Sequence, residues 1–342
     1  MKTITKGKNM NKLKKVGLTA LAGSLAAISA QAAEMSVSGA TVLTYTSADG
    51  SEVTGNPYGM KTNLSFTASG EVNGYNVSYM QTSMDKFAGM TSARLSIDMG
   101  DLGTLAFDQG SGSGLGTIDD KTPTAAEEIW DGLDTAGSAA GAKGLVGAAG
   151  ATGVWNYVKT VSGVTFNGAF RKGSATANSD GGTSGTAASA GLGAWDFALT
   201  GSGDDYGAPG LTWGLGYGEK EVAASEDEHT TYFANYSVGM ATVGAQFSTI
   251  ELGATGATDQ ETQAWGVAVN VNDDLSVSYG ERDVEFDKTG ANATVTEEGF
   301  GYAIAYTMGS IKIAGNRNDV KDNDGTAASN DEMTEIAVSF AF

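Results

Sequence analysis

Acidic side chains gather in one stretch near the middle of the chain, between Gln109 and Gly153. The carboxylates that could do chemistry there form two adjacent pairs, Asp119 with Asp120 and Glu127 with Glu128. Carboxylate oxygens can bind a hard cation such as Ca2+. They can also form one side of an electric field across a narrow, water-filled passage. The plainer alternative is that these four side chains are ordinary solvated charges.

The sequence contains no set of residues with a recognised catalytic arrangement. The chain has no cysteine, which excludes disulfides and thiolate metal sites. Its one histidine, His229, cannot build a zinc site alone, and none of the Gly-x-Ser runs forms a nucleophile elbow. The run from Asp322 to Gly325 fails the EF-hand pattern because Val320 occupies the first ligand position. We therefore predict that the protein is not an enzyme.

The stretch from Gln109 to Gly153 is itself too long for an ordinary connection. It opens with four alternate glycines (Gly110, Gly112, Gly114 and Gly116) and closes with a Gly/Ala-rich run over 136–153. The glycine spacing does not match a dinucleotide-binding fingerprint, and no crossover helix follows. A connection of this length indicates a functional loop.

Alternating apolar and polar residues predict that β-strands hold this loop in place. Between Met35 and Phe342 the alternation predicts sixteen strands. The last strand places four apolar residues on one face (Ile336, Val338, Phe340 and Phe342). Such an edge would invite aggregation, but the edge disappears if the last strand pairs with the first and closes a barrel. We therefore predict an all-β, closed antiparallel barrel.

The predicted connections alternate strictly between short and long, and most acidic residues fall in the long ones. Short connections lie near residues 70–74, 100–103 and 161–163. Short turns at one end and long loops at the other are typical of transmembrane barrels, whose long loops are extracellular. On this pattern His229, in the acidic run 226–229, is expected in an extracellular loop.

Residues 1–32 have the features of a signal peptide: basic residues, an apolar segment, and a small-residue cleavage pattern at Ala30-Gln31-Ala32. We expect Sec-dependent export, with Met1 or Met10 as the start and a mature barrel over 33–342. Loss of six leader lysines would move the formal charge from −20 to about −26. So acidic a chain is not expected to bind nucleic acid, which requires a basic face.

At this point the chain resembles the general diffusion porins of Gram-negative bacteria, most closely the alphaproteobacterial, Rhodobacter-type porins. The resemblance is carried by the terminal Phe342 with Phe340, and by the acidic loop 109–153 after the fifth of sixteen strands. It implies an outer-membrane homotrimer among lipids and lipopolysaccharide, and a C-terminal signal read by the barrel assembly machinery. It also implies a third extracellular loop that folds into the lumen and can hold Ca2+ on Asp119, Asp120, Glu127 and Glu128.

Strand phase selects the charged residues expected to face this loop across the lumen. The predicted basic wall is Lys61, Arg94 and Arg171, and Asp108 on the fifth strand joins the acidic set. A barrel of this size leaves an aqueous channel. The sequence therefore predicts a porin for passive diffusion of small hydrophilic solutes and ions, with mild cation preference. A reversal potential showing anion preference would contradict that preference.

Two alternatives stay open at this stage. A substrate-selective channel would carry an aromatic slide or a basic ladder in its lumen, whereas the predicted aromatic residues fall mainly on the outer face. A secreted acidic surface protein built as a β-solenoid would explain the acidity, but the chain shows no repeat of fixed period.

Overall fold

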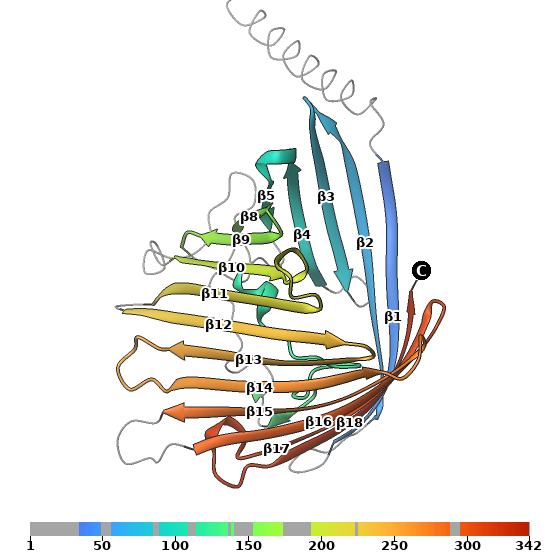
Figure 1. Cartoon of the computed structure of the whole chain (residues 1–342), viewed down its shortest axis with the longest axis vertical. Helices are drawn as coiled ribbons and strands as arrows, with labels where there is room; N and C mark the ends of the chain where they lie inside the picture. The colour runs from blue at the N-terminus through green and yellow to red at the C-terminus, as the bar shows by residue number, and fades with distance from the viewer. Residues whose placement is uncertain are drawn as a thin grey trace, which may run out of the picture.

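Sixteen strands close into one antiparallel barrel (Figure 1). The structure is a computed structural model, and it describes residues 34–48, 56–84, 89–108, 114–135, 138–139, 153–173, 193–222, 225–287 and 295–341. In barrel order the strands are β1 (Glu34–Ala48), β2 (Tyr58–Val72), β3 (Tyr75–Met84), β4 (Gly89–Asp98), β5 (Thr104–Asp108), β8 (Val154–Val161), β9 (Val164–Arg171), β10 (Ala194–Ser202), β11 (Leu211–Val222), β12 (Ser225–Val238), β13 (Ala241–Glu251), β14 (Asp259–Asn270), β15 (Leu275–Asp287), β16 (Val295–Met308), β17 (Ile311–Lys321) and β18 (Asp331–Ala341). The predicted fold class is confirmed.

The first and last strands form the closing seam of the barrel. In β1, Leu43 lies opposite Val338 of β18, and Tyr45 lies opposite Ile336. Because β1 also pairs with β2, the sheet has no free edge. Phe340 lies on the outer face at this seam, whereas Phe342 and the predicted signal peptide lie outside the described residues.

The outer face of the strands carries an exposed apolar belt. Large side chains alternate with buried or polar ones along each strand, because successive residues of a strand point to opposite faces. Members of the belt that expose more than a third of their surface include Leu43, Tyr79, Leu95, Phe166, Leu215, Tyr232, Val243, Trp265, Tyr302, Ile313 and Ile336. This alternation, apolar outside and polar inside, is the pattern of a membrane barrel.

Several strands continue beyond the belt into segments that the sequence pattern assigned to loops. β11 and β12 pair as far as Val222 and Ser225, so that only residues 223–224 connect them. The expectation that His229 lies in a loop is therefore wrong, because it pairs with Gly218 inside the sheet. The apolar alternation predicted strand ends too early here, because charged residues interrupt the alternation while the backbone hydrogen bonds between the strands continue.

Short helices and one small hairpin complete the described elements. The helices are η1 (Gly100–Leu102), η2 (Leu115–Ile118), η5 (Asp204–Tyr206) and η6 (Asn323–Gly325), and the hairpin pairs β6 (Asp134–Thr135) with β7 (Ser138–Ala139). No helix in the described ranges has the length and apolarity needed to cross a membrane. Packed apolar cores form where η2 and the residues after it meet the inner wall.

Candidate functional site: a loop segment seated along the inner wall

Residues 114–135, the longest described part of the predicted constriction loop, contact the inner wall from β9 to β18. The segment begins where the Gly114 N–H donates to Asp196 Oδ1 of β10 at 2.6 Å. Leu115 and Ile118 then pack in a buried cluster with Ala198, Phe233 and Ile250 of three wall strands. This segment therefore lies against the inner face of the wall, opposite the apolar belt.

Gln246 of β13 fixes the next part of the loop segment. Its Nε2 donates to the carbonyl oxygen of Ile118 at 2.7 Å, and its Oε1 accepts from the Lys121 N–H at 2.7 Å. The side chain is 1% exposed. A buried amide that lost these partners would leave polar groups unsatisfied. Gln246 thus holds the backbone of η2, and of the residues that follow it, by hydrogen bonds.

A row of four glycines then lets the loop lie close to the sheet. In register across β13 to β16, Gly244 lies opposite Gly266, Gly266 opposite Gly280, and Gly280 opposite Gly301. A Cβ added at Gly266 would stand 2.7 Å from the Pro123 carbonyl oxygen, and one at Gly301 would stand 3.0 Å from the Cα of Ile129. We call Gly244, Gly266, Gly280 and Gly301 the glycine track.

Beyond the track, the loop ends against β17 and β18. Leu133 packs with Val320 and Met333 in a second buried cluster. At the middle of the segment, the Ala125 N–H donates to Ser278 Oγ at 2.9 Å. The sequence offered a signal for the track, since Gly266, Gly280 and Gly301 each directly follow an aromatic residue, but it did not show that these glycines lie in one register.

The loop acids form a crowded group of carboxylates. Asp120 is hydrogen-bonded to Glu128, and burial together with that neighbour raises the pKa of Asp120 to about 8. Burial also raises the pKa of Asp119, against the opposing attraction of Lys121. Asp120 therefore keeps its proton at neutral pH.

A second carboxylate group differs from the predicted calcium set. One oxygen from each of Glu127, Glu128 and Asp131 lies within 4.8 Å of the others. Asp119 and Asp120 are not members, and Asp131 was not among the predicted site residues. Burial and the neighbouring Glu127 raise the pKa of Asp131 to about 6. Three carboxylates suit a hard cation in charge and ligand type, although Ca2+ would need further oxygens from water.

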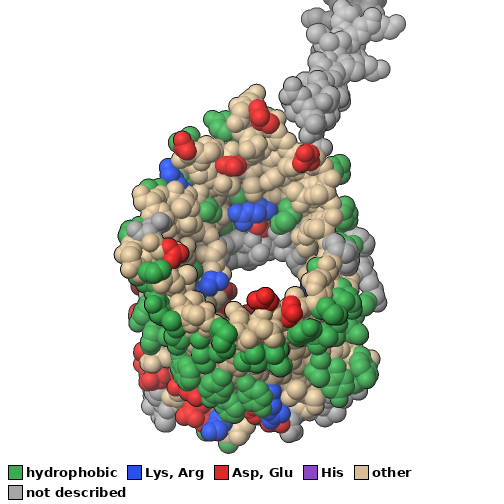
Figure 2. Space-filling view, turned by 45° about the vertical axis from the view of Figure 1, so that its right-hand side comes forward, with side chains coloured by type: hydrophobic (Ala, Val, Ile, Leu, Met, Phe, Trp, Pro, Cys, Tyr) green, Lys and Arg blue, Asp and Glu red, His purple; other side chains and the backbone are tan. Residues whose placement is uncertain are grey.

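The predicted basic residues lie on β2, β4 and β9, and of these strands β9 contacts η2 of the loop segment. Arg94 of β4 forms an ion pair with Asp108 of β5 at 3.6 Å and donates to Asn156 Oδ1 at 2.7 Å. Asp108 therefore accompanies Arg94 instead of the loop acids. Arg171, at the end of β9, is 7% exposed, and Lys61 of β2 is exposed. Figure 2 shows a hollow through the barrel with basic and acidic side chains on opposite parts of its rim.

An ion pair that the sequence did not reveal supports the loop from behind. The Arg282 guanidinium of β15 forms an ion pair with Glu297 of β16 and lies 5.0 Å from the ring centroid of Trp130 in the loop. Glu297 also accepts from the Asp324 N–H of η6 at 2.8 Å. The inward phase of Arg282 was readable from its strand, but its partners come from distant segments.

Arg317 lies on the outer face of β17, where it forms ion pairs with Asp319 and Glu332 on the same surface. Strand phase indicates the face on which such a residue lies but not its cross-strand partners.

The closed barrel and its apolar belt define a sixteen-stranded, porin-like β-barrel fold. The chain resembles OmpT of Vibrio cholerae with a TM-score of 0.66 and 10% identity, over 91% of this chain and 98% of that one. It resembles an anion-selective porin from Comamonas acidovorans with a TM-score of 0.62 and 12% identity, over 91% and 100%. It also resembles a variant of the Rh. blastica porin with a TM-score of 0.59 and 14% identity, over 90% of this chain and 100% of that one. No family model matches, and no curated protein matches.

Proposed function

We propose that the chain is a general diffusion porin of a Gram-negative outer membrane, of the Rhodobacter type. Its loop segment 114–135 forms the waist of the pore. The observation that carries this proposal is the position of that segment along the inner wall from β9 to β18. Such seating keeps the loop out of the centre of the lumen and leaves a water-filled passage beside it.

The charges at the waist support a selectivity mechanism. Asp119, Asp120, Glu127 and Glu128 line the loop side, while Lys61 and Arg94 stand on β2 and β4. Opposed charges across a narrow gap order water and disfavour apolar solutes. The formal excess of acidic residues favours cations. One similar structure is described as anion-selective. The fold alone therefore does not decide between cation and anion selectivity, and in this proposal the charges at the waist decide it.

The remaining parts of the proposal concern assembly. We propose Sec-dependent export after removal of residues 1–32, insertion by the barrel assembly machinery through the Phe340–Phe342 signal, and a homotrimer among lipids and lipopolysaccharide. One similar structure is described as a trimer form of OmpT. Ca2+, if bound at the waist, would be held by Glu127, Glu128 and Asp131. There it would cancel part of the acidic charge.

Solute flux and conductance test the proposal. Folded protein in liposomes should pass small sugars at rates that fall with solute size and do not saturate, and in planar bilayers it should give large open steps. Saturating flux for one solute would favour a substrate-selective channel instead. An absence of both flux and conductance from heat-modifiable, folded protein would overturn the proposal.

A further inference from the structure

A second loop folds onto the inner face of the barrel, at the end that carries the long loops. Residues 322–330 connect β17 to β18, and we call them the mouth loop. Its short helix η6 packs against β15 and β16. Asn323 is 0% exposed, and Gly325 is buried against the ring of Phe286, which lies in the inward phase of β15. The mouth loop therefore covers part of the inner wall.

Hydrogen bonds within the mouth loop give it a defined shape. The Asn323 N–H donates to the Ser329 carbonyl oxygen at 2.7 Å, and the Ala328 N–H donates to Asp322 Oδ1 at 2.6 Å. Both bonds join the two halves of the loop. We therefore expect the mouth loop to move as one unit when any of its residues is displaced.

Glu297 of β16 connects the mouth loop to the wall of the barrel. Its Oε2 accepts from the Asp324 N–H of η6 at 2.8 Å, and its Oε1 forms the ion pair with the Arg282 guanidinium of β15. Glu297 is 0% exposed and Arg282 is 2% exposed. A buried carboxylate needs all of its partners, because water does not replace one that is lost. Glu297 is thus a shared support of the mouth loop and of Arg282.

Arg282 extends this connection to loop segment 114–135, the proposed waist. Its guanidinium lies 5.0 Å from the ring centroid of Trp130, which belongs to that segment and is 8% exposed. A cation attracts an aromatic ring more strongly where water is excluded. Because the mouth loop covers Glu297, its displacement would admit water to the ion pair. The attraction that holds Trp130 beside Arg282 would then weaken.

We infer that Glu297 is a positioning residue of the pore, because it couples the mouth loop to segment 114–135. With the mouth loop in place, Arg282 holds Trp130 against the inner wall. When the mouth loop is displaced, Trp130 is released and segment 114–135 fluctuates into the lumen. The effect on current rests on the proposed function, whereas the coupling itself can be measured at Trp130 in a protein that does not conduct.

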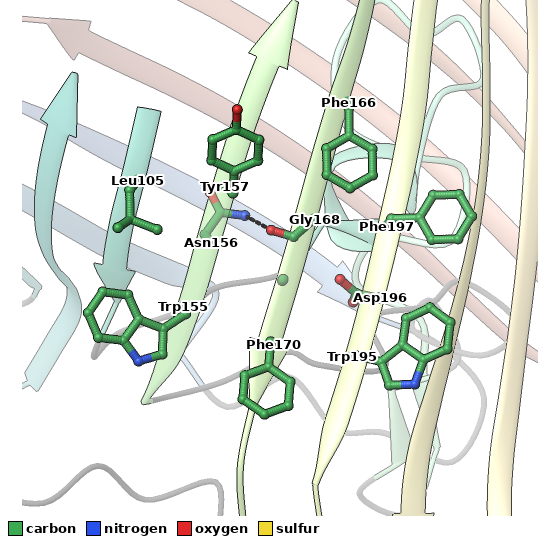
Figure 3. Close-up of a pocket in the computed structure, with 11 residues that line it drawn as sticks. Leu105, Trp155, Asn156, Tyr157, Phe166, Gly168, Phe170, Trp195, Asp196 and Phe197 are labelled. Atoms are coloured by element: carbon green, nitrogen blue, oxygen red, sulfur yellow. Dashed lines mark hydrogen bonds between the residues drawn. The ribbon is translucent and has the colours of Figure 1, made fainter. Parts of the chain in front are cut away.

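Iodide quenching of Trp130 fluorescence, measured on the folded chain in detergent, tests the coupling. In every protein the other four tryptophans, Trp155, Trp195, Trp213 and Trp265, are replaced by Phe, so that only Trp130 is observed. These replacements avoid the waist, since Trp155 and Trp195, for example, belong to the outer aromatic surface over β8 to β10 (Figure 3). Heat-modifiability confirms that each protein is folded.

Gly325→Ala is the central variant, because it changes only the mouth loop. Its new Cβ would stand 2.7 Å from the ring and 3.0 Å from the Cβ of Phe286, which is 3% exposed and has no room to turn aside. We expect the quenching constant of Trp130 to rise severalfold and the open-channel current to become noisier. Gly309→Ala is the matched control, because Gly309 also has a positive φ, of 60°, but an added Cβ there would meet nothing within 4 Å.

The double variant Arg282→Met with Glu297→Leu tests whether Glu297 carries the effect. It leaves no unpaired buried charge, so the barrel should fold, and its Trp130 should already be open to iodide. Adding Gly325→Ala should then cause no further rise. A further rise would overturn the role of Glu297, as would unchanged quenching in Gly325→Ala or an equal rise in Gly309→Ala. Proteins that conduct no current but show the expected quenching would count against the proposed function and support the coupling.

Discussion

Asn235 and Asn318 stand at the two ends of the glycine track, and each donates from its Nδ2 to the backbone of the loop. Asn235 lies opposite Gly244 and reaches the Lys121 carbonyl oxygen at 2.7 Å. Asn318 lies opposite Gly301 and reaches the carbonyl oxygens of Glu128 at 3.1 Å and of Asp131 at 2.8 Å. Asn235, the glycine track and Asn318 thus form six positions in one register. Together they make a surface for the loop that has no side chains in the middle and a hydrogen-bonding amide at each end.

We predict that a larger side chain in the glycine track lowers the conductance of the pore without unfolding the barrel. In Gly266→Val the new side chain would meet the Pro123 carbonyl oxygen, which belongs to the loop backbone and cannot simply rotate away. We expect the loop to move into the lumen and single-channel conductance to fall. Gly315→Val, on the outer face, is the control and should conduct normally. Equal conductance in both variants would refute a positioning role for the track.

Loss of the Asn318 amide should loosen the loop. Asn318→Leu leaves two loop carbonyl groups without their donor, at a cost of about 1–3 kcal/mol for buried groups. We expect noisier open-channel current and faster proteolysis of the loop, with the barrel still heat-modifiable. Asn76→Leu, at a strand end away from the loop, provides the comparison. A quiet, protease-resistant Asn318→Leu channel would show that the hydrogen bonds do not hold the loop.

The buried ion pair behind Trp130 makes a stability prediction. Arg282 and Glu297 are 2% and 0% exposed. Removing only Arg282, as in Arg282→Met, leaves a buried carboxylate unpaired and should cost about 3–5 kcal/mol. The double variant Arg282→Met with Glu297→Leu should recover most of this loss, because no buried charge is left. Unfolding by denaturant in detergent measures both, and equal losses in the two variants would contradict the argument.

The raised pKa of Asp120 predicts a pH-dependent selectivity. The pKa of Asp120, about 8, lies above its ordinary value of 3.8. The folded loop therefore keeps a proton that the unfolded chain loses, and this contribution to stability falls as pH rises from about 4 to 8. Above this window the waist gains a negative charge, so cation preference should increase between pH 6 and pH 9. Asp120→Asn should abolish that increase, and a wild type whose selectivity does not change with pH would rule out a protonated Asp120.

Local alternation was enough to predict the barrel. In β18, the alternation of Ile336, Val338 and Phe340 predicted which face of the strand is apolar. Because an apolar edge strand must be paired, the same strand predicted that the barrel closes by pairing of β18 with β1. The same reasoning failed for His229, since the end of an apolar pattern marks the end of the belt and not of the strand.

The site was only partly predictable for a different reason. Strand phase placed Arg94 and Arg282 on the inner face, but it could not show that Asp108 pairs with Arg94 or that Glu297 pairs with Arg282. Those contacts depend on register and on segments distant in sequence. For the same reason, the sequence did not show that Asp131 lies beside Glu127 and Glu128.

The most direct test of the account is the reversal potential in a KCl gradient. We would compare the wild type with the variant Asp119→Asn, Asp120→Asn, Glu127→Gln, Glu128→Gln. A control would remove four exposed acids from the outer face: Glu261→Gln, Asp283→Asn, Glu285→Gln, Asp287→Asn. If loop 114–135 is the waist, the first variant loses cation preference and the control keeps it. An unchanged reversal potential in the first variant, or an equal shift in both, would contradict the account.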